Sequence, residues 1–194
     1  MIVSHSKRFI FFHIPRTAGS ALRTALNSHQ YIDFNTEDYI KKLPPGIDPM
    51  HINQTIARPM LENVDHYFEF TVVRNPLIRL LSLYNKFFNK FGTFSNFIQR
   101  LSAHYNNTFP ISVHADIFNS QLHWIQTPLT SKIHIFKFED IVKDTTELSV
   151  KLGIDPFFLP KENQAQQLVD SLSTTEIDFC KEFLKLEYEI LNYN

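Results

Sequence analysis

Residues 8–26 read RFIFFHIPRTAGSALRTAL, and this stretch decides how the chain begins to fold. The apolar run Phe9–Ile14 is typical of a buried strand, and a proline follows it at once. Arg16, small polar residues and Gly19 come next, before an amphipathic pattern over Ser20–Ser28 predicts a helix. Such a turn aims backbone N–H groups and the positive end of a helix dipole at one point. The stretch therefore predicts an anion site, which favours a phosphorylated or sulfated nucleotide.

The composition indicates one globular domain, residues 1–194. Of the 194 residues, 43% are hydrophobic and 20% are charged, which suits a chain with its own core. A net charge of −1 offers no general attraction for a polyanion, so we expect no nucleic-acid partner. No window is apolar enough to span a membrane or to form a signal peptide, which favours a cytoplasmic protein. The single cysteine, Cys180, lies on an apolar helical pattern and is predicted to be a buried thiol.

Apolar runs alternate with helical patterns along the rest of the chain. Asn53–Asn63 reads as a helix broken at Pro59, and Lys42–Met50 reads as a loop rich in proline. Further strands are predicted at Tyr31–Phe34, Phe68–Val73 and Lys132–Phe138. Short apolar runs separated by helices predict an α/β fold whose mainly parallel sheet is covered on both faces.

Two later helices carry clear start signals. Asp144, with a glutamate three residues on, predicts the cap of a helix that ends at Gly153. Ser173 and Glu176 form the same pattern before a C-terminal helix predicted over residues 174–191.

A second informative segment, Phe70–Phe88, reads FTVVRNPLIRLLSLYNKFF. Its strand ends at Arg74, and the asparagine and proline that follow suit the N-cap and first position of a helix. The helical period predicts an apolar face that packs on the sheet. The opposite, polar face carries Arg79, Ser82 and Lys86. The residues alone leave two interpretations open: a ligand site at the carboxyl edge of the sheet, or a solvated helix face beside a strand-end arginine.

Together the two segments resemble the sulfotransferases that use 3′-phosphoadenosine 5′-phosphosulfate (PAPS), and among them the carbohydrate sulfotransferases of the heparan 2-O and chondroitin type. That family's motifs read H-x-P-K-T-A-G-T and R-x-P-x-x-R-x-x-S-x-Y. This chain has HIPRTAGS at residues 13–20 and RNPLIRLLSLY at residues 74–84. A weaker likeness continues through Asn119–Gln121 and Ile135–Asp140. The resemblance implies a three-layer fold like that of P-loop-containing nucleotide hydrolases, with a central, mainly parallel sheet flanked by helices.

The resemblance also implies PAPS as donor and 3′-phosphoadenosine 5′-phosphate (PAP) as product, with no metal. The 5′-phosphosulfate would be cradled by Arg16, Thr17, Ala18, Gly19, Ser20 and Ala21. Arg74 and Ser82 would hold the 3′-phosphate. Backbone N–H groups and Arg16, as the catalytic cation, would stabilise the charge that grows on the leaving phosphate. Arg16 and Ser20 stand where the family usually has lysine and threonine, so a planar guanidinium replaces a compact ammonium.

The reaction also needs a base for the acceptor hydroxyl, and histidine suits it because its pKa lies near neutrality. The family often carries a histidine between the two motifs, and His51 fits that position, so we predict His51 as the catalytic base. The alternative is a loop histidine with no role. His13, within the first motif, is predicted to be a structural hydrogen-bonding residue. The implied acceptor is a carbohydrate or another hydroxyl-bearing molecule, and a compact, anchor-free chain without disulfides suits a bacterial, cytoplasmic enzyme.

Two other functions remain possible. A P-loop kinase would need G-x-x-x-x-G-K-[ST] and an acidic residue for Mg²⁺ at the end of a strand, and we find neither in the sequence. A non-catalytic relative that binds the nucleotide or an acidic glycan would carry the same donor-site residues, so the sequence does not separate it from an enzyme. No histidine or cysteine cluster has the spacing of metal ligands.

Overall fold

The structure is a computed structural model that describes residues 1–28, 43, 50–105, 115–125, 133–159 and 169–194. It divides into two compact units, Met1–Val73 with Gln121–Lys161 and Arg74–Ser120 with Glu162–Asn194, which we call the sheet unit and the helical unit. The predicted strand Tyr31–Phe34 and most of the predicted loop Lys42–Met50 lie outside the described residues. That the whole chain acts as one domain stays a prediction.

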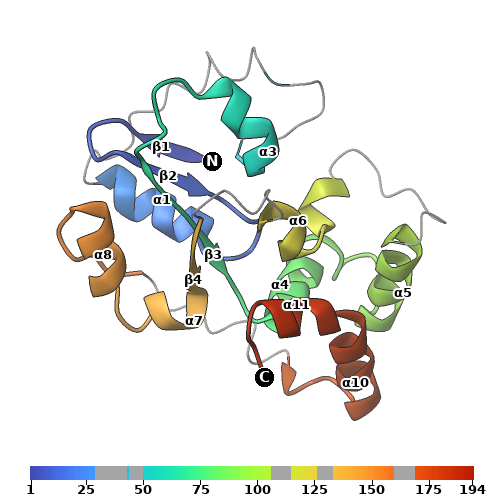
Figure 1. Ribbon diagram of the computed structural model, residues 1–194. Helices are drawn as coiled ribbons and strands as arrows, with labels where there is room; N and C mark the ends of the chain where they lie inside the picture. Colours follow the sequence, from blue (N-terminus) through green and yellow to red (C-terminus); the bar gives the residue numbers. More distant parts are fainter. Residues whose placement is uncertain (29–42, 44–49, 106–114, 126–132, 160–168) are drawn as a thin grey trace. The chain divides into compact units, whose positions relative to one another are not determined.

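The sheet unit is built on four strands in the order β1-β2-β3-β4 (Figure 1). β1 is antiparallel to β2, whereas β2, β3 and β4 are parallel, and Phe11 of β2 lies opposite Phe70 of β3. The strands are β1 (Ile2–Ser4), β2 (Phe9–Phe12), β3 (Phe68–Val73) and β4 (His134–Lys137). All four residues of β2 are buried, which explains why its sequence is continuously apolar instead of alternating.

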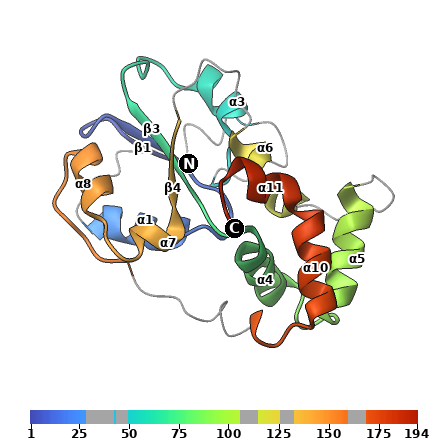
Figure 2. The same cartoon turned by 60° about the horizontal axis from the view of Figure 1, so that its bottom comes forward.

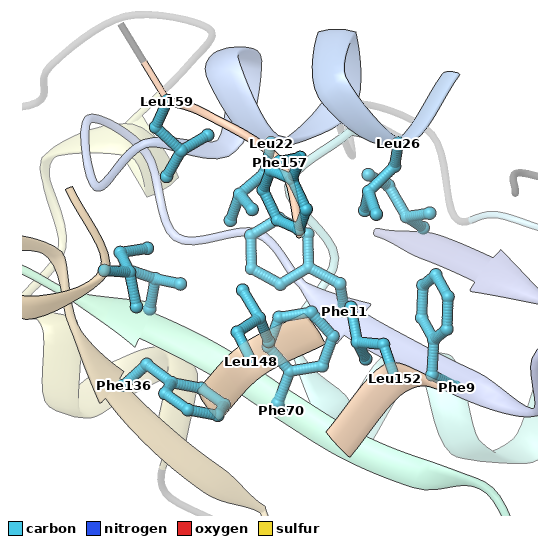
Figure 3. Packing of buried hydrophobic residues seen from close by; sticks show 13 residues of the cluster. Phe9, Phe11, Leu22, Leu26, Phe70, Phe136, Leu148, Leu152, Phe157 and Leu159 are labelled. Atoms are coloured by element: carbon cyan, nitrogen blue, oxygen red, sulfur yellow. The ribbon is translucent and has the colours of Figure 1, made fainter. Parts of the chain in front are cut away.

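Both faces of this sheet carry a hydrophobic core. On one face, the phenylalanines of the strands meet Leu22 and Leu26 of α1 (Gly19–Ser28), as Figure 3 shows, together with residues of α7 (Phe138–Ile141) and α8 (Thr146–Leu152). On the other face, alternate residues such as Ile10 and Phe12 form a cluster with the segment around α3 (Gln54–Ala57) and the 3₁₀ turn η1 (Arg58–Met60). The predicted α/β fold, a mainly parallel sheet flanked by helices, is confirmed.

The helical unit has a core of its own. It contains α4 (Pro76–Phe87), α5 (Phe94–Tyr105), η2 (Ala115–Phe118), α10 (Thr174–Phe183) and α11 (Lys185–Ile190). Leu77, Leu80 and Leu81 of α4 pack with apolar residues of α5, η2 and α10, and Figure 2 shows α4, α5 and α10 close together. Helices of its own unit therefore pack on the apolar face of α4, and its packing on the sheet stays a prediction. Periodicity marks an apolar face, but it does not say which neighbour covers that face.

The helix ends follow the predicted signals with small differences. Ser173 and Glu176 form a capping box, but the C-terminal helix is divided at Leu184 into α10 and α11. Gly153 ends α8 with a φ of 63°, as its missing side chain allows. Asp144 is not the N-cap of α8: Thr145 holds that position, and the Asp144 carboxylate accepts the Thr146 N–H at 2.8 Å.

Two smaller predictions are also settled. The helix expected over residues 53–63 is shorter, because α3 ends at Ala57 and η1, which contains Pro59, follows it. Cys180 is fully buried, and burial together with the charge of Glu176 raises the pKa of its thiol to about 12. It is a structural thiol, as predicted. None of the helices in the described ranges is long and apolar enough to cross a membrane.

Candidate functional site

The loop between β2 and α1 contains two residues with positive φ. Arg16 and Ala18 have φ angles of 67° and 91°, while Thr17 between them does not have a positive φ. Where left-handed residues alternate with right-handed ones in a turn, successive N–H groups point toward one concave site. Each non-glycine residue in the left-handed region costs roughly 1–2 kcal/mol, and such strain is concentrated at functional sites. The two positive φ angles lie in the loop for which the sequence predicts an anion site, and the site itself stays a prediction.

Three contacts hold this loop in place. The Thr17 hydroxyl is buried and donates to the Ile14 carbonyl at 2.8 Å, and the Leu22 N–H donates to the Ala18 carbonyl at 2.9 Å to begin α1. Gly19 lies against the imidazole of His13, so that a Cβ at residue 19 would stand 1.7 Å from His13 Nε2. Only glycine fits at that position without movement of the ring.

The residues of the loop differ in what they can offer a ligand. The hydroxyl of Thr17 is already used by the backbone, and Ala21 packs against the sheet core. These residues and Gly19 can therefore contribute only backbone N–H groups. Ser20 is exposed in the first turn of α1, and Arg16 is half-buried, so their side chains are the ones that can reach a bound anion.

His51 lies beside this loop, as the sequence interpretation requires. Its Nδ1 is 3.1 Å from the backbone carbonyl of His13, and the two imidazole rings are 4.4 Å apart. A carbonyl only accepts hydrogen bonds, so Nδ1 must carry the proton, and the neutral ring then has its lone pair on Nε2. The geometry therefore selects the tautomer of His51 that can take a proton at Nε2.

His13 is a poor alternative for the base. Its ring is buried, stacks on Phe11 at 5.8 Å, and has a pKa held well below 6.5, first by burial and then by the neighbouring charge of His51. His13 is therefore neutral, and its carbonyl and ring support His51 and the Gly19 turn. Its backbone carbonyl takes part in a hydrogen bond with His51, whereas a hydrogen-bonding role of its ring stays a prediction.

The segment that follows His51 is fastened to the sheet by buried polar groups. Gln54 Nε2 donates to the Glu69 carboxylate on β3 at 2.6 Å, and the Arg58 guanidinium forms an ion pair with the same carboxylate. Gln54 and Glu69 are both almost fully buried. Since loss of these partners would leave the buried Glu69 carboxylate uncompensated, this network anchors α3 and thereby the residues that carry His51.

Trp124 of α6 (Gln121–Ile125) is a neighbour that the sequence interpretation missed. Its ring lies edge-on to His51 at a centroid distance of 6.3 Å, and it is 3% exposed. Within the described part of the chain, no hydrogen-bond partner meets its buried indole N–H. It belongs to no motif, and its being the chain's single tryptophan was the only signal available.

The second motif lies at the start of the helical unit. Asn75 caps α4 by accepting the Ile78 N–H at 3.2 Å, and Pro76 occupies the first turn, as predicted. Arg74 and Ser82 are both buried. Arg79 is buried too, and its guanidinium donates to the Ile117 carbonyl at 3.2 Å. The expectation that Arg79 belongs to an open polar face is therefore wrong, because it is used inside the unit.

The predicted site residues thus fall into two described groups. The loop and His51 lie together in the sheet unit, while Arg74 and Ser82 belong to the helical unit. Across the described ranges, no three His, Cys, Asp or Glu side chains are grouped so as to hold a metal ion.

Comparison with known proteins places these features in a family. Carbohydrate sulfotransferase 14 of Mus musculus is 32% identical over 103 residues, which are 53% of this chain and 26% of that protein. The Homo sapiens protein of the same name is 29% identical over 103 residues. The chain thus matches about a quarter of the length of these relatives. A crystal structure of a sulfotransferase from Alicyclobacillus acidocaldarius covers 95% of this chain and is itself covered to 94%, with 11% identity and a TM-score of 0.40.

The match to a family is broader than the match to any of these proteins. The sequence profile of the sulfotransferase family matches residues 1–194, and so it includes both motifs and the segment between them. The chain therefore belongs to the sulfotransferase family.

Proposed function

We propose that this chain transfers a sulfuryl group from PAPS to a hydroxyl of a carbohydrate. The observation that carries the proposal is the turn before α1, where Arg16 and Ala18 have positive φ, in a chain of the sulfotransferase family. The fit is chemical as well, because the N–H groups at that turn suit an anionic ligand.

The donor site would be divided between the two motifs. Backbone N–H groups of residues 16–21 and the Arg16 guanidinium would bind the 5′-phosphosulfate, and Arg74 and Ser82 would bind the 3′-phosphate. The bound donor supplies an activated sulfuryl group and a phosphate leaving group. Arg16 would stabilise the charge on that phosphate, a contribution of about 3 kcal/mol for a well-placed donor.

His51 would act as the base. Its Nε2 would take the proton of the acceptor hydroxyl while the hydroxyl oxygen attacks sulfur. The Nδ1–H bond to the His13 carbonyl supports this role, since it stabilises the positive ring that results. The neighbouring His13 stays neutral and does not compete for the proton.

The proposal also includes the class of the acceptor and the location of the protein. A carbohydrate acceptor is supported by the names of the relatives, both of which are carbohydrate sulfotransferases. A cytoplasmic, bacterial origin stays a prediction from the sequence. A non-catalytic nucleotide- or glycan-binding relative is the main alternative, because donor binding alone would use the same residues.

Calorimetry with PAP tests the donor site. Purified protein should bind PAP without Mg²⁺, and Arg74→Ala should weaken binding roughly 10- to 100-fold, because a charge-assisted contact is lost. Lys86→Ala is the matched control, since Lys86 is an exposed cation on α4, the helix that follows Arg74, and its loss should leave binding unchanged. Preference for ATP with Mg²⁺ over PAP would instead support a kinase and refute the proposal.

Transfer from labelled PAPS tests catalysis. His51→Ala should lower turnover about 10²- to 10⁴-fold while PAP binding is retained. His66→Ala, at an exposed histidine, serves as the control. Unchanged turnover in His51→Ala would exclude this residue as the base, and wild-type protein that binds PAP but transfers no label to any glycan would favour the non-catalytic alternative.

A further inference from the structure

The hydroxyl of Tyr188, on the C-terminal helix α11, is linked to the start of α4. It donates a hydrogen bond to Asn75 Oδ1 at 3.4 Å, across 113 positions of sequence. The same oxygen caps α4 by accepting the Ile78 N–H at 3.2 Å. Asn75 Oδ1 therefore has two donors, one from its own helix and one from α11.

The surroundings of Tyr188 show that this contact is built into the unit. Its ring is half-buried and packs against the core of the helical unit. Burial raises the pKa of the phenol, and the hydrogen bonds with the Leu77 backbone and with Asn75 oppose that rise. The hydroxyl is thus engaged at the first turn of α4, and its neutral form is the donor that Asn75 requires.

Asn75 matters because of the residue before it. Arg74 is the cation proposed to bind the 3′-phosphate, and it is 5% exposed. Its direction depends on the peptide between it and the cap residue, whose φ and ψ are −45° and 126°. A group that holds Asn75 also restricts Arg74, and a shift of about 1 Å in a binding cation is enough to lose much of its effect.

We propose that Tyr188 is a positioning residue for the 3′-phosphate site, which means that the C-terminal helix sets how well the protein distinguishes a 3′-phosphorylated nucleotide from one without that phosphate. The inference rests on the proposed function. It assigns to α11 a role in donor selection that neither motif carries.

The test is the ratio of the dissociation constants for adenosine 5′-monophosphate and PAP, measured by calorimetry. Tyr188→Phe keeps the ring and its packing but removes the hydroxyl. We expect PAP to bind roughly three- to tenfold more weakly and the monophosphate to bind equally well, so the ratio falls by that factor. Tyr84→Phe is the control, because its hydroxyl donates instead to the Gly92 carbonyl at 2.9 Å.

The other outcomes are equally clear. Equal losses for both nucleotides, or no loss for PAP, would overturn the positioning role. If the wild-type protein does not bind PAP more tightly than the monophosphate, the proposed function itself is refuted, whatever the role of Tyr188. Asn75→Ser provides a second variant, because serine caps a helix well but its shorter side chain withdraws the partner of Tyr188. It should lower the ratio of dissociation constants as Tyr188→Phe does. The double variant should lower that ratio no further than either single variant.

Discussion

Replacement of Gly19 by alanine tests how the loop and the histidine pair depend on each other. A Cβ at residue 19 would lie 1.7 Å from Nε2 and 1.8 Å from Cδ2 of His13, whereas carbon contacts normally lie at about 3.5–4.0 Å. The imidazole would have to move by about 2 Å. It is confined by Phe11, with ring centroids 5.8 Å apart, and by His51, at 4.4 Å.

The expected loss follows from these contacts. Overpacking of this kind costs about 1–3 kcal/mol, and disturbance of the His51 bond to the His13 carbonyl adds about 1 kcal/mol. Alanine in place of glycine at a helical position recovers up to about 1 kcal/mol. The net decrease in the free energy of unfolding is therefore about 2 kcal/mol, which lowers Tm by roughly 4–8 °C for a chain of this size.

Urea and thermal unfolding measure this loss, and two further variants make the result specific. Gly92→Ala is the matched control, because the nearest atom to its new Cβ is 3.5 Å away and no comparable loss is expected. His13→Ala removes the obstacle, so the double variant Gly19→Ala/His13→Ala should be more stable than the sum of the single effects predicts, by about 1 kcal/mol. Gly19→Ala as stable as Gly92→Ala, or strictly additive effects, would refute the reasoning.

Four further predictions concern the same loop and its neighbours. Ala18→Gly should raise the free energy of unfolding by up to about 1 kcal/mol, since it relieves the strain of a positive φ, and it should weaken PAP binding, since it makes the loop more flexible. A lower free energy of unfolding in urea would contradict this. Arg16→Lys should keep labelled transfer within about tenfold, whereas Arg16→Met should lose about 10²-fold; equal losses would show that charge is not what Arg16 contributes. The pKa of His13 is held well below 6.5 in the folded protein, so as the pH falls below this value the imidazole becomes protonated in the unfolded chain and not in the folded one. The urea concentration at the unfolding midpoint should therefore drop between about pH 7 and 5.5, and it should drop less in His13→Gln. His51→Ala should change the fluorescence of Trp124, because the two rings lie 6.3 Å apart, and an emission spectrum identical to that of the wild type would contradict this contact.

Much of the local structure could be predicted from the sequence because its signals are local. β3 occupies the predicted residues Phe68–Val73. Asn75 caps α4 with its side chain, and Pro76 begins the helix with its restricted φ, which are the properties from which this helix start was predicted. The capping box at Ser173 is another such signal. The position of His51 next to the first loop was also anticipated, although from the order of motifs in a family and not from a physical pattern.

The sequence by itself thus determined the order of strands, loops and helix starts, and which residue types stand at the two motifs. Only the tertiary structure decided what surrounds them. It decided that helices cover the apolar face of α4, that Arg79 is used internally, and that Tyr188 reaches Asn75 across 113 positions. It also decided the neutral state of His13 and the tautomer of His51, because burial and a carbonyl 38 residues away set them. Caps and periodicity act within a few residues, whereas burial, protonation and side-chain partners depend on groups that only folding brings together.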